Sequence, residues 1–366
     1  MDQLDSIASA IEEIRQGKLV IVVDDEDREN EGDFICAAEC ITPDIINFMA
    51  LYGRGLICTP ITEDRAKELE LDLMVEQSTA LHETAFTISI DLIGKGCTTG
   101  ISAYDRATGI KALVDPNTKP SDFGRPGHLF PLKAKNGGVL RRTGHTEAAI
   151  DLARLAGFSP AGVLVEILNA DGTMARLPQL KEIAAEHDLR IISIKDLVAY
   201  RLQTERLVYK EIAVPAQSKW GEVEIVAYRQ VTTGDTHLAI VWGEWKPEDP
   251  LLVRVHSTTE TGDILGTLFD DYGIQMHEAM KKIKEAGKGV LLYMRHTEGN
   301  SIIHKLRHLK EGVAVEKSEQ RDFGVGAQIL RDLGVRKIRL LTRNPKRRVA
   351  LDGYGLEIVE NVALDF

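Results

Sequence analysis

The sequence has 366 residues, and its 45 Lys and Arg against 56 Asp and Glu give a formal net charge of −11. This length fits two domains that each bury a core, and 43% hydrophobic with 28% charged residues excludes disordered and fibrous classes. The acidity argues against a nucleic-acid partner, and a polar N-terminus without any long apolar run argues against a membrane partner or a signal peptide.

Charge and cysteine are unevenly distributed along the chain. Residues 1–205 contain 21 Lys and Arg against 33 Asp and Glu, whereas residues 206–366 contain 24 against 23. The four cysteines all precede residue 100 and form no CxxC pair: Cys36, Cys40, Cys58 and Cys97. Few, unpatterned thiols predict a reduced, cytoplasmic protein. The second half has no cysteine, so it cannot build a thiolate zinc site.

In the first half, helical and strand periods alternate. A helix is expected from Leu4 to Ile14, ended by Gly17, and buried strands at 19–24 and 34–39. Further helices are expected at 43–52, 63–70, 144–156, 178–187 and 195–205, and further strands at 55–59, 84–90, 162–168 and 190–194. This alternation predicts an α/β fold with a mixed sheet.

The pattern changes beyond residue 205. Strands are expected at 223–229, 237–243 and 251–257, followed by a helix at 276–286, a strand at 289–295, a helix at 323–333 and a strand at 337–342. We therefore predict two domains, 1–205 and 206–366, the second of α+β type.

The most acidic segment directly follows the first predicted strand. Residues 24–33, DDEDRENEGD, contain seven carboxylates and one arginine. Such a run is often a solvated loop, but the mutual repulsion of these carboxylates favours a bound divalent cation, and their oxygens suit Mg²⁺ or Mn²⁺. The end of a buried strand is also where α/β folds place their sites.

Two segments rich in Arg, Gly and His precede the helix expected at 144–156. They are DFGRPGH (122–128) and RRTGHTE (141–147), and they are typical of an anion cradle that would hold a substrate phosphate. The alternative is a helix cap with two incidental histidines, His128 and His145. His145 could be a metal ligand or an acid/base group.

Three further positions have two interpretations each. Thr108 lies in a segment that could bind phosphate or only cap a helix. Glu166, within an apolar strand, is either an acid/base group or a salt-bridged core residue. Cys58 could line the site, but a buried free thiol is the simpler reading. Chemistry alone thus predicts a metal-dependent enzyme acting on a small phosphorylated substrate.

Residues 1–205 resemble 3,4-dihydroxy-2-butanone 4-phosphate synthase. The segments that carry the resemblance are DDEDRENEGD, GISAYDRATGI (100–110), DFGRPGHLFPL (122–132), RRTGHTEAAIDLARLAG (141–157) and GVLVEILNADGTMAR (162–176). The resemblance implies conversion of D-ribulose 5-phosphate to L-3,4-dihydroxy-2-butanone 4-phosphate and formate, a step of riboflavin biosynthesis. It also implies Mg²⁺ or Mn²⁺, a homodimer, and a three-layer α/β fold with a mixed sheet.

The same resemblance implies roles for individual residues. Glu29 and His145 would ligate the metal, and His128 and Glu166 would be a catalytically essential pair. Either Glu31 or Asp33 would transfer protons. The substrate, with its phosphate, would be held by Arg28, Glu29, Asp33, Thr108, Arg142, Thr143, Gly144, His145, Thr146 and Glu166.

The second half resembles GTP cyclohydrolase II in the segments 253–273, 289–300 and 321–346. That family binds zinc through three cysteines, whose places are taken here by Thr259, Asp270 and Tyr272. We therefore predict a degenerate domain without cyclohydrolase activity. The alternatives are a bifunctional enzyme that also hydrolyses GTP, or a scaffold or nucleotide-sensing module. Asp270 could form a replacement metal site with His256, His277 or the pair His304 and His308. The favoured alternative is that these are solvent-facing residues of helices and loops that bind no metal.

Overall fold

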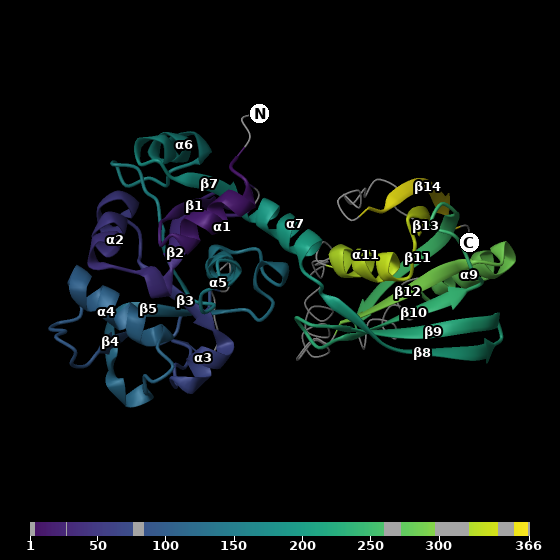
Figure 1. The fold of residues 1–366 in the computed structure, drawn as a ribbon, viewed down its shortest axis with the longest axis horizontal. Coiled ribbons are helices and arrows are strands. Elements are labelled where there is room, and N and C mark those ends of the chain that lie inside the picture. Colours follow the sequence, from purple (N-terminus) through teal and green to yellow (C-terminus); the bar gives the residue numbers. More distant parts are fainter. Residues whose placement is uncertain are drawn as a thin grey trace, which may run out of the picture. The chain divides into compact units, whose positions relative to one another are not determined.

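The computed structural model describes residues 4–26, 28–75, 84–259, 272–296, 322–342 and 355–364. The chain divides into two compact units, a first unit of residues 1–201 and a second unit of residues 202–366. Within the described residues, each unit contains one seven-stranded sheet (Figure 1). None of the described helices is long and apolar enough to span a membrane.

The sheet of the first unit is mixed. Its strand order is β4 (Ile90–Leu92), β5 (Phe123–Ala134), β3 (Cys58–Thr62), β6 (Gly162–Glu166), β2 (Gly32–Ala37), β1 (Val20–Val23) and β7 (Arg190–Ser193). The pairs β3–β5 and β1–β7 are parallel, and the other neighbours are antiparallel. Because β2 lies between β1 and β6, the acidic segment that links β1 to β2 stays at one end of the central strands.

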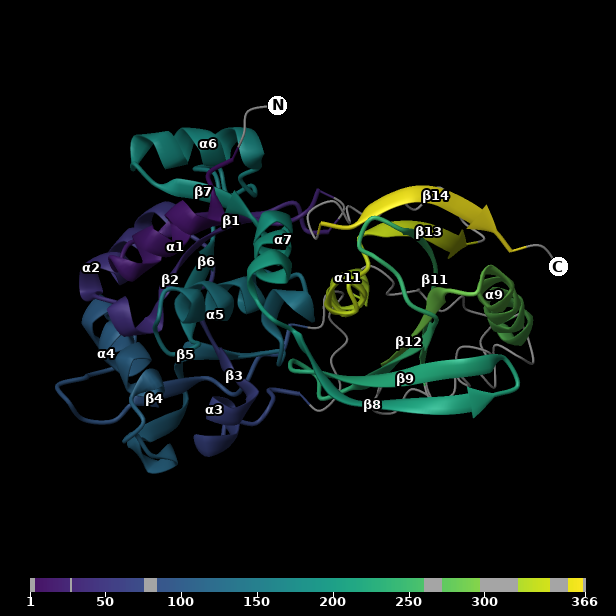
Figure 2. The same ribbon diagram turned by 45° about the vertical axis from the view of Figure 1, so that its right-hand side comes forward.

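Helices cover both faces of this sheet, as Figure 2 shows. Val20, Val22 and Ile35 pack into one core with α1 (Ile7–Arg15), α5 (His145–Leu155) and α7 (Ile194–Thr204). Ile21 and Phe34 face a second core with α2 (Pro43–Phe48), α3 (Glu63–Glu68), α4 (Ala103–Val114) and α6 (Leu177–Glu186). Alternate residues of each strand thus enter opposite cores, which confirms the predicted α/β class and its three layers.

Two predicted elements of the first unit differ from the structure, and two observed elements were not predicted. The helix expected at 43–52 is α2 followed by a π-helical turn, Met49–Gly53, that ends at Arg54 with φ 69°. The strand expected at 84–90 is an extended segment with isolated bridges, and regular pairing starts at β4. α4 and β5 were not predicted as elements, because buried Asp105 interrupts the apolar pattern of α4 and two glycines and two prolines interrupt that of β5.

The second unit has strand order β14 (Glu357–Ala363), β13 (Lys337–Thr342), β11 (Pro250–Thr259), β12 (Gly289–His296), β10 (Thr236–Trp242), β9 (Gly221–Gln230) and β8 (Val208–Ser218). The described residues of this unit also form the helices α9 (Tyr272–Ala286) and α11 (Asp322–Asp332). Trp242, Leu252 and Ile283 lie in its core. Every element predicted between residues 223 and 342 is present. β8 was not predicted because most of its side chains are exposed.

Candidate active site

The acidic segment after β1 is folded around a buried carboxylate. The side chain of Asp24 is 1% exposed and pairs with the Arg28 guanidinium at 2.9 Å. It also accepts backbone N–H groups from Glu29 at 3.1 Å and Glu31 at 2.8 Å. Arg176, directly before α6, donates to the carbonyl oxygens of Glu29 and Asn30. These contacts fix the turn of the segment and thereby the orientation of the carboxylates that follow Asp24.

Strand pairing brings two more carboxylates together. Asp33 on β2 is the register partner of Glu166 at the end of β6. Glu166 Oε2 accepts the backbone N–H of Leu56 at 2.8 Å. A Cβ at Gly55 would lie 2.5 Å from that same oxygen, so only glycine leaves room for the Glu166 carboxylate. Two acids that are 133 residues apart in sequence thus share one end of the sheet.

His145 is the first residue of α5 and faces this acidic group. Its Nε2 lies 3.1 Å from the Val22 carbonyl oxygen, and because a carbonyl oxygen only accepts, Nε2 carries the proton. Nδ1 lies 3.9 Å from Glu29 Oε2 and 3.9 Å from Asp33 Oδ1. An imidazole whose other nitrogen is fixed by a carbonyl is the usual arrangement of a metal-ligating histidine.

Burial and neighbouring charges lower the pKa of one carboxylate in this cluster and raise the pKa values of two others and of His145. The neighbouring His145, together with Arg28, lowers the pKa of Glu29 to about 2. Burial raises the pKa of Asp33 to about 7, with Glu166 and Glu31 adding to the rise. Burial raises the pKa of Glu31 as well. For His145, burial alone lowers the pKa, but the carboxylates, Asp33 first, outweigh it and raise the pKa to about 9.

The group fits a hard divalent cation. Asp33 Oδ1 is buried without a hydrogen-bond partner. Ligand atoms of Asp24, Glu29 and His145 all lie within 4.8 Å of one another. Because Asp24 already accepts three N–H donors, Glu29 and His145 are the residues best placed to ligate an ion. Asp24 and Arg176 were not predicted as site residues, although Asp24 opens the acidic run.

A cavity of about 140 Å³ lies over these side chains. Most residues predicted for the site line it: Arg28, Glu29, Glu31, Asp33, Arg142, His145, Thr146 and Glu166. Cys58 also lines it, and burial, then Glu166, raises the pKa of its thiol. Apolar residues that the sequence did not indicate complete the wall: Phe86, Leu132 and Leu164, together with Thr84.

Arg142 and the N-terminus of α5 form the cationic side of the cavity. Gly144 is the N-cap of α5, and a Cβ there would lie 2.3 Å from Arg142 Nη1. Glycine therefore lets Arg142 fold over the helix start, where it pairs with Glu147 at 2.7 Å. Thr143 belongs to the same turn but does not line the cavity. This arrangement can hold a phosphate.

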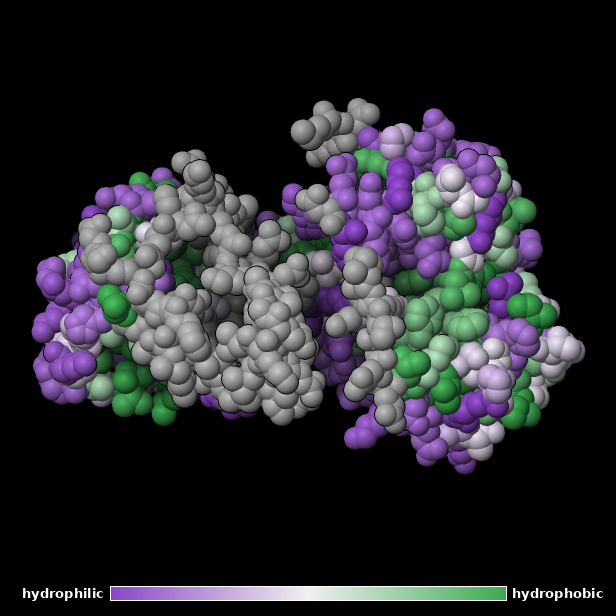
Figure 3. Space-filling view, turned by 180° about the vertical axis from the view of Figure 1, so that it is seen from behind, coloured by the Kyte–Doolittle hydropathy of each residue, from purple (hydrophilic) through white to green (hydrophobic). Residues whose placement is uncertain are grey.

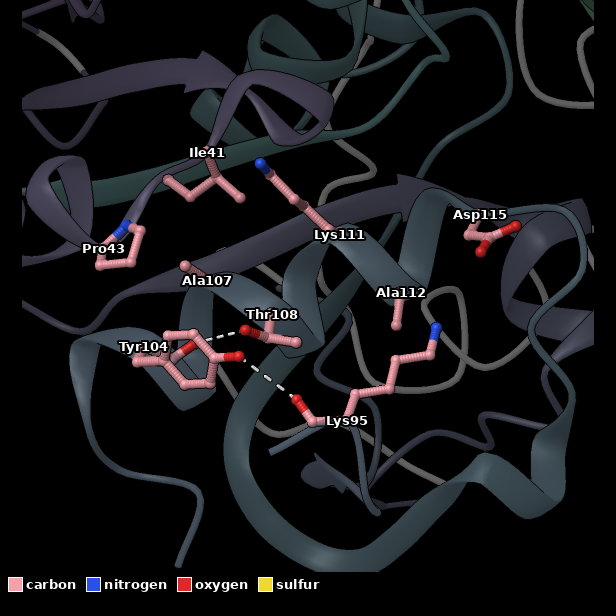
Figure 4. A pocket seen from close by; sticks show the side chains of 9 residues that line it. All are labelled: Ile41, Pro43, Lys95, Tyr104, Ala107, Thr108, Lys111, Ala112 and Asp115. Atoms are coloured by element: carbon pink, nitrogen blue, oxygen red, sulfur yellow. Dashed lines mark hydrogen bonds between the residues drawn. The ribbon is translucent and has the colours of Figure 1, made fainter. Parts of the chain in front are cut away.

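Two further predicted residues lie away from the cavity and from the turn before α5. The Thr108 hydroxyl donates to the Tyr104 carbonyl oxygen at 2.8 Å and lines another pocket, with Lys95 and Lys111 at its rim (Figure 4). His128, on β5 and nearly half exposed, pairs through Nδ1 with Asp91 at 2.7 Å. The sequence predicted that segments 122–128 and 141–147 form one phosphate-binding site. In the structure they do not line the same cavity, because residues 122–128 lead into β5 and lie away from the turn before α5.

The residues considered in the second unit are partly described. Arg254, in the segment 253–273 that carries the second resemblance, donates to the Leu341 carbonyl oxygen and to Gln275. His256 is buried and stacks on Tyr293, and His277 lies edge-on to Trp220. Asp270, His304, His308 and the side chains of Thr259 and Tyr272 lie outside the described residues.

Comparison with known proteins finds two families in one chain. The family model described as 3,4-dihydroxy-2-butanone 4-phosphate synthase matches residues 8–200, and that of GTP cyclohydrolase II matches residues 209–363. The riboflavin biosynthesis protein RibBA of Cytophaga hutchinsonii is 59% identical over 375 residues, which cover 99% of this chain and 93% of the relative. The RibBA protein of Aquifex aeolicus is 52% identical over 376 residues, with the same coverage.

Solved structures agree with this assignment. RibBX, a two-domain 3,4-dihydroxy-2-butanone 4-phosphate synthase from A. baumannii, is similar with a TM-score of 0.77 and 39% identity, covering 99% of this chain and 100% of that chain. A 3,4-dihydroxy-2-butanone 4-phosphate synthase in complex with two magnesium ions is similar with a TM-score of 0.54 and 40% identity, covering 55% of this chain and 98% of that chain.

Proposed function

Because this chain belongs to the family of 3,4-dihydroxy-2-butanone 4-phosphate synthases with a fused GTP cyclohydrolase II domain, we propose that the cavity of its first unit is the synthase active site. There D-ribulose 5-phosphate is converted to L-3,4-dihydroxy-2-butanone 4-phosphate and formate for riboflavin biosynthesis. The observation that carries this assignment is the convergence of Glu29 and His145 with Asp33 and Glu166 at one cavity.

In this proposal Glu29 and His145 hold Mg²⁺ or Mn²⁺. When bound, the ion acts as a Lewis acid on the ketose carbonyl. Support comes from the unpartnered Asp33 Oδ1 beside the candidate ligands and from the magnesium complex of a related synthase. Arg142, the turn of Thr143 and Gly144, and Thr146 hold the substrate phosphate at the start of α5.

Proton transfer falls to the carboxylates around the ion. Asp33 takes the proton at C3 of the sugar, since its carboxylate lines the cavity beside the candidate metal ligands and its Oδ1 has no hydrogen-bond partner. Loss of the C1 hydroxyl needs a proton donor, and the raised pKa of Glu31 suits that role. Glu166, held by the Leu56 N–H, lies opposite Asp33 and serves the later transfers that accompany rearrangement and formate release.

We also propose a homodimer. Leu56, next to Glu166, is 42% exposed, and Leu73, Met74 and Val75 are exposed as well. Hydrophobic side chains reach the surface at several places on the face shown in Figure 3. His128 and Thr108 keep the catalytic and binding roles that the resemblance implies. Because neither lines the cavity of a single chain, a second copy is the simplest way to bring them to it.

For the second domain we propose that cyclohydrolase activity is lost. No cysteine follows Cys97, so thiolate ligands for a catalytic zinc are missing from its sequence. A related chain of the same two-domain length is described only as a synthase. The bifunctional alternative is supported by the RibBA name of the curated relatives and by the cyclohydrolase II match itself. A third possibility is that the second domain is a scaffold or a nucleotide sensor.

We further propose a cytoplasmic location, on the basis of four unpaired thiols.

A formate assay on two substrates tests these proposals. Ribulose 5-phosphate should yield formate, and EDTA, Glu29→Ala or His145→Ala should each lower the rate at least about 100-fold because the ion is lost. Glu26→Ala, an exposed acid of the same segment outside the cavity, is the matched control and should leave the rate unchanged. GTP should yield no formate. Synthase activity that survives chelation and both substitutions contradicts the site, and formate from GTP supports the bifunctional alternative.

A further inference from the structure

The loop before α5, residues 135–144, is tied to that helix by a buried carboxylate. Glu147, 1% exposed, accepts the Lys135 N–H at 3.0 Å through Oε1 and the Arg142 guanidinium at 2.7 Å through Oε2. Both ends of the loop are therefore anchored to the first turn of α5. The position of Arg142 in the cavity depends on how this loop is held.

A second buried carboxylate holds the middle of the loop one helical turn later. Asp151 Oδ2 accepts the Val139 N–H at 2.8 Å and Arg201 Nη1 at 2.7 Å. The same Nη1 donates to the Gly137 carbonyl oxygen at 2.8 Å. Gly138 has φ +62°, and a Cβ there would lie 2.2 Å from Asp151 Oδ1, so the loop wraps closely around this carboxylate.

Arg201 thus joins α7 to the loop that carries Arg142. Asp151 and Arg201 are each 3% exposed, and the pair is inside the first unit. Removing one partner of a buried pair leaves an uncompensated charge, and the surroundings move to relieve it. A loop held by turns moves more easily than the two helices it contacts. The expected result is a displaced loop rather than an unfolded unit.

We propose that Arg201 is a positioning residue for the synthase reaction, which fixes the 135–144 loop through Asp151 and the Gly137 carbonyl so that Arg142 meets the substrate phosphate. This inference rests on the proposed function. It gives α7, which contributes no residue to the cavity lining, a role in substrate binding. A displacement of about 1 Å at such a position is enough to weaken binding of the substrate phosphate.

The test uses the full chain with Arg201→Met and Arg201→Lys. Formate release is measured against ribulose 5-phosphate concentration, together with inhibition by inorganic phosphate and the thermal midpoint. Arg201→Met should raise KM and the phosphate inhibition constant about tenfold, while kcat changes less than about threefold. Arg201→Lys keeps the charge but not the geometry of the guanidinium, so it should give intermediate values.

Two arginines serve as matched controls. Arg154 lies 3.8 Å from the same Asp151 carboxylate but is 41% exposed. Arg65 holds two backbone carbonyls, those of Leu113 and Asp115, and does not line the cavity. Arg154→Met and Arg65→Met should leave KM unchanged even where the thermal midpoint falls.

An unchanged KM in Arg201→Met, with a thermal midpoint lowered as in Arg65→Met, would reduce Arg201 to a stabilising residue and overturn the inference. If Arg201→Met does not fold, an unchanged KM in Arg201→Lys has the same consequence. Failure of the unmodified chain to release formate would instead reject the proposed function.

Discussion

Asp33 and Glu29 are carboxylates of the same cluster, yet their surroundings give them opposite chemistry. Glu29 is partly exposed and lies 3.9 Å from His145, whose charge helps to keep it ionised, as its proposed role as a metal ligand requires. Asp33 is fully buried among other carboxylates, so its ionised form is disfavoured without a cation. One loop thus supplies a permanent anion and a group that can exchange a proton near neutral pH.

Replacing Asp33 by Asn should stabilise the metal-free protein. The folded-state pKa of Asp33 is raised from 3.8 to about 7, so stability that is complete below pH 3.8 is lost as the pH rises through 7. Asn stays neutral, and at pH 8 in EDTA the gain should be on the order of 2–4 kcal/mol, vanishing near pH 4. Thermal unfolding at both pH values measures this, and formate release should be lost. A less stable Asp33→Asn protein at pH 8 contradicts the burial argument.

At this scale, the sequence allowed the ionisable residues to be predicted but not their partners. Glu29, Glu31 and Asp33 could be found because they are neighbours in one acidic run. His128 on β5 pairs with Asp91, which lies 37 positions earlier in the sequence. Arg176 reaches the acidic loop from 146 positions away. Such contacts are set by tertiary packing, which periodicity does not report.

Elements with a clear hydrophobic pattern were predicted from the sequence, whereas elements with a mixed polar and apolar pattern were not. β1 and β2 are short buried strands bounded by polar residues, and α5 has a regular apolar face. α4 instead buries Asp105, which accepts the Thr98 hydroxyl and the Gly100 N–H. β5 contains Pro126 and glycines, which normally end a strand. In α4 and β5, these residues therefore interrupt the hydrophobic periodicity from which a helix or a strand is predicted.

The N-cap residue of α6, Arg176, contributes to the site. Arg176 donates to the Glu29 carbonyl oxygen at 2.9 Å and to that of Asn30, so it sets the turn that directs the Glu29 carboxylate. Arg176→Met should weaken Mn²⁺ binding about tenfold or more, as loss of outer-shell partners generally does. Electron paramagnetic resonance titration with Mn²⁺ measures the dissociation constant.

Arg190→Met is the control for Arg176. Arg190 is a half-exposed arginine of β7 that pairs with Asp5 and does not touch the acidic turn. Its substitution should leave Mn²⁺ affinity unchanged. Equal weakening by both variants would mean that Arg176 acts through general stability rather than through the turn.

On the scale of the whole molecule, the described residues that line the proposed synthase cavity, and those of both cores around its sheet, belong to the first unit. The fragment 1–205, which includes all of α7, should therefore fold and release formate within about threefold of the full chain. Circular dichroism and the formate assay check this. An inactive but folded fragment would indicate that the second domain contributes to catalysis or to assembly, and would support the scaffold alternative.

The buried thiol of the cavity has a practical consequence. The pKa of Cys58 is raised, and the pKa values of Cys36, Cys40 and Cys97 are raised too, each mainly by burial. Thiolate, the reactive form, is therefore scarce at neutral pH throughout the native chain. A cysteine introduced at an exposed position of the cysteine-free second domain would react with maleimides far faster than these four. A fluorophore or spin label can thus be attached selectively to the second domain.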